Sequence, residues 1–230
     1  HRLVPGHRER LDEAEGHPFH RVRVLDDLPQ HEDVSVGLRD GTPRIALVVV
    51  DNLMMTREVL AEVRRQAGQA TGIPTARMLI SATHTHSAPS VMGALGSRAD
   101  EAYTRFLPGQ IVQSIVLAAD KLEPARVGWT SVQDYAHNHC RRWVYRPDRM
   151  PNDPFGDRTV RAMMHPGHQS PQHVGPAGPA DQGLTLLSVQ SLDGRPIAVL
   201  ANYAMHYKGS PAVSSDFCGR FEDALASLIG

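Results

Sequence analysis

The 230-residue chain has little of several features that mark specialised classes of protein. Its 2 cysteines, Cys140 and Cys218, are too few and too far apart to indicate a disulfide framework or a thiolate zinc site. No stretch approaches the roughly 18 apolar residues of a membrane helix, and the first residues lack the basic-then-apolar layout of a signal peptide. A formal net charge of −1 provides no basic surface for nucleic acid or an anionic membrane. These absences favour a small or neutral substrate.

The composition is that of an ordinary globular protein, with 41% hydrophobic and 21% charged residues. We expect an arm or loop over residues 1–18 and one large domain over residues 19–230. The chain begins at His1 rather than at a methionine, which is typical of a processed or trimmed product. Its location is then secreted or periplasmic if a signal peptide has been removed, and cytoplasmic otherwise.

The first half of the chain contains a strand, helix, strand pattern. Residues 45–50 (IALVVV) form a continuous apolar run, which is typical of a strand buried on both faces. Residues 56–71 predict a helix with one apolar stripe, with Thr56 as N-cap and Gly72 as stop. A second apolar run follows at residues 78–82. The crossover has a suitable length for two neighbouring strands.

The second half mixes clear and unclear patterns. Residues 100–122 predict a helix that Pro108 either kinks or divides into two. Residues 184–190 and 196–203 predict a hairpin around an Asp-Gly turn. Residues 135–183 carry 7 prolines and almost no periodicity, which predicts a long functional or disordered loop.

Smaller signals complete the fold prediction. Residues 19–25 and 127–132 predict two more strands, and a helix begins at about Arg220. Helices interleaved with strands and a hairpin predict an α/β or α+β fold with mixed sheets. Within the proline-rich segment, the cluster at residues 137–143 is either a solvated basic turn or part of a functional site. His165, His168 and His173 are interpreted as polar loop residues.

Two of the apolar strands lead to histidines. In MLISATHTHS, His84 and His86 are two residues apart, and a strand continuing to that point would turn both imidazoles to one face. Imidazole nitrogen is a preferred zinc ligand, although both histidines are equally well explained as polar residues where a strand enters a loop. His206 follows the strand PIAVLANYAM. Asp51, at the end of the first strand, is either a cap or a hydrogen-bond partner of a histidine.

Three motifs carry a resemblance to a known family. SATHTHSAP, LANYAMHYKGSPAVSSDFCG and VVVDNLMMTREVL resemble the N-terminal catalytic domain of the neutral, non-lysosomal ceramidases, particularly uncharacterised bacterial members. The resemblance extends over roughly residues 19–221. It implies a single-domain α/β fold with mixed sheets packed between helical layers, a four-layer αββα-like arrangement. Ala88 and Ser90 stand where the family has glycine.

The resemblance also implies an activity and site residues. His84 and His206 correspond to zinc ligands. His86 and Arg141 correspond to residues that contact the substrate amide or its tetrahedral intermediate. The implied reaction is zinc-dependent hydrolysis of an N-acyl bond in ceramide or a related lipid amide, a reaction of sphingolipid metabolism.

Two histidines do not complete a zinc site, which normally has about three protein ligands. The resemblance places a glutamate and a tyrosine ligand downstream of Gly230; otherwise His86 or Asp216 must complete the set. Asp216 matches an acidic position after the second histidine, and the resemblance implies that it either hydrogen-bonds a metal ligand or fixes the loop.

Two other functions remain open at this stage. A His-x-His at the end of a strand also begins the metal sites of phosphoesterases and other ester hydrolases. Against that reading, Ser87-Ala88 stand where metallo-β-lactamase-like proteins have Asp-His. Alternatively, a ceramidase-like domain without its later ligands would serve as a binding module.

Overall fold

The computed structural model describes residues 20–22, 34–38, 44–94, 96–167, 169–207 and 213–229. These residues form a mixed α/β fold with three α-helices and three sheets, which confirms the predicted fold class. The N-terminal segment of residues 1–18, expected to be an extension or loop, lies outside the described residues. Within the described part, no helix combines the length and apolar character needed to span a bilayer. Cys140 and Cys218 are both free thiols.

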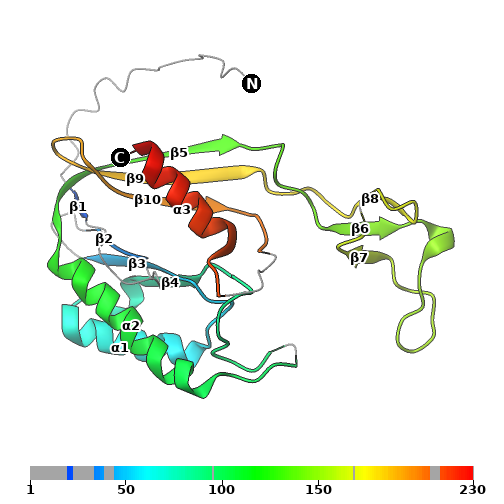
Figure 1. The fold of residues 1–230 in the computed structure, drawn as a ribbon, viewed down its shortest axis with the longest axis horizontal. Coiled ribbons are helices and arrows are strands. Elements are labelled where there is room, and N and C mark those ends of the chain that lie inside the picture. The colour runs from blue at the N-terminus through cyan, green and yellow to red at the C-terminus, as the bar shows by residue number, and fades with distance from the viewer. Residues whose placement is uncertain are drawn as a thin grey trace, which may run out of the picture.

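The layers follow the order helix, sheet, sheet, helix (Figure 1). Helices α1 (Arg57–Thr71) and α2 (Glu101–Asp120) lie together on one side of the stack. The sheet β2-β3-β4 lies next to them, followed by the sheet β1-β5-β9-β10. Helix α3 (Asp216–Ile229) lies on the opposite side from α1 and α2.

The smaller of the two stacked sheets has β3 (Ile45–Val50) at its centre. It pairs antiparallel with β2 (Val34–Leu38) and parallel with β4 (Met78–Ala82), so the ends of β3 and β4 meet at one edge. Helix α1 connects them as predicted. The hydroxyl of Thr56 accepts a hydrogen bond from the Val59 N–H, and Gly72 ends the helix with a left-handed φ of 73°.

The main core lies between this sheet and the two helices. Val48 and Val50 are fully buried on one face of β3, where they belong to one cluster with Val63 of α1 and Ile111 of α2. On the other face, Leu47 packs against Val189 and its neighbours in the second sheet. Strand β3 is therefore covered on both sides, which explains its uninterrupted apolar sequence.

Helix α2 is one helix that includes Pro108. Of the two predicted arrangements, the division into two helices is therefore wrong. Leu107 and Ile111, on either side of the proline, are both buried in the main core. Their packing outweighs the hydrogen bond that the proline removes.

The larger sheet is antiparallel throughout. Its strands, in spatial order, are β1 (His20–Val22), β5 (Glu123–Gln133), β9 (Gly183–Ser191) and β10 (Pro196–Tyr203). The predicted hairpin between β9 and β10 is confirmed, and Gly194 provides the positive φ of 91° that its turn requires.

The third sheet corrects the prediction of a long loop. Residues 134–182, here called the arm, extend from the ends of β5 and β9 and contain β6 (Arg142–Tyr145), β7 (Ala162–Met164) and β8 (His173–Pro176) (Figure 1). Strand β6 lies between the other two and pairs antiparallel with both. Strands of three or four residues are too short to produce a recognisable alternation, so the sequence did not reveal them.

Candidate metal centre

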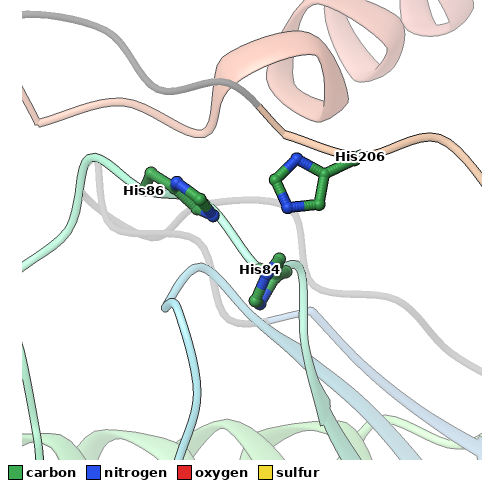
Figure 2. Close-up of side chains that lie close together, drawn as sticks. All are labelled: His84, His86 and His206. Atoms are coloured by element: carbon green, nitrogen blue, oxygen red, sulfur yellow. The ribbon is translucent and has the colours of Figure 1, made fainter. Parts of the chain in front are cut away.

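Three histidine side chains converge beyond the ends of β4 and β10 (Figure 2). His84 and His86 lie in the loop after β4, and His206 follows β10. The ring centroids of His84 and His86 are 5.0 Å apart, and those of His84 and His206 are 5.2 Å apart. The ring nitrogens that could bind a metal all lie within 4.8 Å of one another. The structure thus brings the two predicted zinc ligands together.

The loop after β4 does not continue as a strand. The strand ends at Ala82, and His84 has a left-handed backbone with a φ of 68°. The predicted extended geometry of the His84–His86 pair is therefore wrong, although the two rings still meet. The N–H of His84 donates to the carbonyl oxygen of Asn52 at 3.0 Å, which holds the turn against the loop after β3. A left-handed conformation costs a non-glycine residue about 1–2 kcal/mol, and such conformations concentrate at functional sites.

A main-chain carbonyl fixes the ring of His84. Its Nδ1 lies 2.9 Å from the carbonyl oxygen of Leu53. Because a carbonyl can only accept a hydrogen bond, Nδ1 is assigned the proton, which leaves the lone pair of the neutral ring on Nε2. This is the usual outer hydrogen bond of a metal-binding histidine, and it sets both the tautomer and the direction of the ring.

The surroundings of His206 favour its neutral form. Partial burial lowers the pKa of His206, and the positive charge of Arg141 lowers it further, with smaller contributions from His86 and His84. Neutral imidazole is the form that binds metals. His206 is therefore suited to be a ligand at neutral pH.

The three histidines fit a zinc ion chemically. Three imidazole ligands with one position left for water or substrate make a common catalytic zinc site. Ligand atoms on tetrahedral zinc are about 3.4 Å apart, so small side-chain rotations are needed to close nitrogen separations of up to 4.8 Å. His86 is exposed, which leaves the group open to solvent. The geometry places His86 among the possible metal ligands.

The arm contributes two more residues to this region. Arg141 lies close enough for its charge to lower the pKa of His206. The ring of His165 has its centroid 6.3 Å from that of His206, and the His165 N–H donates to the carbonyl oxygen of Arg141. His165 was interpreted as a polar loop residue, and its place beside His206 was missed. The sequence holds no local signal for it, because its position depends on the pairing of β6 with β7.

The two predicted supporting carboxylates lie outside the three-histidine group that the described residues contain. Asp51 accepts a hydrogen bond at 3.0 Å from the hydroxyl of Thr83, the residue before His84. Asp216 is the first residue of α3, and its N–H donates to the hydroxyl oxygen of Ser214. Helix α1 is capped by Thr56, so Asp51 is not the cap.

No known sequence family and no curated protein matches the chain. Among solved structures, a ceramidase complexed with C2 shares 17% identity at a TM-score of 0.49, over 79% of this chain and 28% of that chain. Neutral ceramidase from Pseudomonas aeruginosa shares 17% identity at a TM-score of 0.48, over 74% of this chain and 25% of that one. The chain thus spans about a quarter of the length of these structures. Likeness at this level concerns the path of the chain and says nothing about the chemistry of the site.

Proposed function

We propose that the chain is a zinc-dependent hydrolase that cleaves an N-acyl amide bond. The observation that carries this proposal is the solvent-accessible group of three histidines at the ends of two strands. A zinc ion held there would lower the pKa of a water molecule to about 7 and polarise a carbonyl group. This combination allows a water molecule to attack an amide carbon at neutral pH.

In this proposal, different residues bind the metal and contact the substrate. His84 and His206 bind the metal, with the Leu53 carbonyl holding the ring of His84 in place. His86 either completes the ligand set or contacts the substrate. Arg141, from the arm, is a hydrogen-bond donor for the negative charge that develops on the carbonyl oxygen, an interaction of a few kcal/mol in enzymes that have it.

The choice of an amide substrate rests on the ceramidase-like sequence motifs, and ceramide or a related lipid amide is the proposed substrate class. The number of groups of possible metal ligands among the described residues supports an amide hydrolase over a two-metal phosphoesterase. The described residues contain one group of three potential ligands. A two-metal site needs ligands for two ions about 3.5–4 Å apart.

Metal analysis tests the first half of the proposal. The purified chain, loaded with zinc and freed of excess, should retain close to one zinc per chain by elemental analysis. His84→Ala and His206→Ala should each abolish retention while circular dichroism remains unchanged. His137→Ala is the matched control, because His137 is exposed and lies outside the three-histidine group. A wild-type chain that retains no zinc contradicts the proposal.

Substrate comparison tests the second half. The zinc-loaded chain is incubated with N-acyl sphingosine analogues and, separately, with aryl phosphates. Release of fatty acid from the amide, lost on chelation, is expected. Turnover of the phosphates alone would support the phosphoesterase alternative, and amide binding without turnover would support the binding module.

A further inference from the structure

A short segment before α3 joins the two parts of the chain that carry the histidines. The hydroxyl of Thr85 donates to the carbonyl oxygen of Ser214 at 2.6 Å, and the Ser214 N–H donates to the carbonyl oxygen of Ser87 at 2.9 Å. Thr85 stands between His84 and His86 and is fully buried, with 0% exposure. Both main-chain polar groups of Ser214 are therefore bound to the loop that carries two of the three histidines.

The first turn of α3, which follows this segment, packs against the residue next to the third histidine. The ring of Phe217, close after Ser214, packs against that of Tyr207 with centroids 4.6 Å apart. Tyr207 directly follows His206 and is only 2% exposed. The Asp216 N–H donates to the Ser214 hydroxyl oxygen at 3.0 Å, which fixes the turn into α3. A continuous path of contacts thus leads from Thr85 through Ser214 and Phe217 to the residue beside His206.

The hydroxyl of Thr85 makes all of its observed hydrogen bonds within the protein. Its hydroxyl oxygen also accepts a hydrogen bond from the Ser87 N–H at 3.3 Å, so it both donates and accepts within the protein. A buried hydroxyl occupied in this way contacts neither a metal nor a substrate. Its effect on the site is through the positions of other residues.

We propose that Thr85 is a positioning residue of the metal centre, which sets the spacing between His206 and the His84–His86 pair through Ser214. This inference rests on the proposed function, because it requires that the three histidines bind one metal ion. Residues that hold metal ligands in position typically change metal affinity by 10–100-fold when altered. We expect a change of that size when the Thr85 hydroxyl is removed.

The variant Thr85→Val keeps the shape of the side chain and removes the hydroxyl. Zinc affinity is measured by competition with a chromophoric chelator, and the thermal stability of the metal-free chain is measured in parallel. Thr85→Val should weaken zinc binding about 10-fold or more, and Thr85→Ser should restore it. Thr104→Val is the matched control, because the Thr104 hydroxyl also donates to a main-chain carbonyl, that of the α2 N-cap Asp100, at 2.7 Å. It should leave zinc affinity unchanged.

Two further backgrounds separate positioning from general stability. In a chain that already carries His86→Ala, and so keeps His84 and His206, adding Thr85→Val should still weaken metal binding relative to His86→Ala alone. With His206→Ala, where His84 and His86 remain, it should have no effect. Copper(II), which binds two-histidine sites more tightly than zinc does, is the probe for these variants.

An equal loss in both backgrounds would overturn the inference, as would a loss of stability in the metal-free chain with unchanged zinc affinity. A wild-type chain that binds zinc but is insensitive to Thr85→Val overturns this inference alone. A wild-type chain that binds no zinc overturns the proposed function as well.

Discussion

The main-chain N–H of His165 donates to the carbonyl oxygen of Arg141 across a distance of 2.9 Å. The two residues therefore stand opposite each other, one step beyond the Arg142–Met164 pair of β6 and β7. Since the Arg141 charge reaches His206 and the His165 ring lies 6.3 Å from the His206 ring, this end of the arm lies beside the three-histidine group. A paired sheet holds the two side chains more rigidly than the predicted loop would.

Substitutions in this pair should affect catalysis and not metal content. Arg141→Gln should lower kcat/KM for amide hydrolysis about 100-fold, because a donor to the developing oxyanion is lost. His165→Gln should lower it by about 10-fold, because the ring that lies beside His206 is replaced by a flexible amide. Steady-state kinetics and elemental analysis measure the two effects. The control is Arg142→Gln, an exposed neighbour within β6. Loss of zinc from either variant, or unchanged kcat/KM, would contradict this assignment.

Two glycine substitutions should change stability in opposite directions. Gly72 ends α1 with a φ of 73°, so Gly72→Ala should cost about 1 kcal/mol of unfolding free energy. Gly109 lies within α2 without a positive φ, so Gly109→Ala should add about 0.5–1 kcal/mol by restricting the unfolded chain. A Cβ at either position meets nothing within 4 Å, so packing does not complicate the comparison. Denaturant unfolding measures both, and a change of the same sign would contradict the helix geometry.

The carboxylate of Asp134 should give the protein an acid-sensitive stability. The Ala136 N–H, the His137 ring and the Tyr203 hydroxyl hydrogen-bond to it and lower its pKa from 3.8 to about 2. A carboxyl group whose pKa is lower in the folded than in the unfolded state stabilises the fold fully at a pH above its unfolded pKa. That stabilisation is lost as the pH falls through its folded pKa. The advantage of wild type over Asp134→Asn should therefore shrink between about pH 4 and pH 2. Thermal unfolding across this range measures it, and a constant difference would mean that the carboxylate does not titrate as described.

Elements with a strong local pattern were predictable from the sequence. Strand β3 and helix α1 were predicted with their bounds nearly correct, because buried β-branched residues, an N-cap and a stop glycine are all local signals. The pairing of His84 with His206 was available only through the resemblance of motifs. No local pattern connects residues so far apart in the chain.

Other features could not be predicted from the sequence, for physical reasons. The backbone of His84 depends on hydrogen bonds to the loop after β3, and a histidine has no intrinsic preference for a positive φ strong enough to indicate it. The position of His165 depends on the pairing of two strands of three and four residues. The contact of Thr85 with Ser214 likewise exists only once the chain has folded.

With a metal bound as proposed, the left-handed turn at His84 would link metal binding to folding. An unfolded chain rarely holds this residue at positive φ, so the three nitrogens meet only in the native state. A ligand that binds only the native state shifts the unfolding equilibrium by mass action, by about 2.7 kcal/mol at a free concentration 100 times its Kd. The melting temperature of the chain should therefore rise with zinc concentration. Thermal unfolding measured over a series of zinc concentrations would then show that the metal contributes to the stability of the fold.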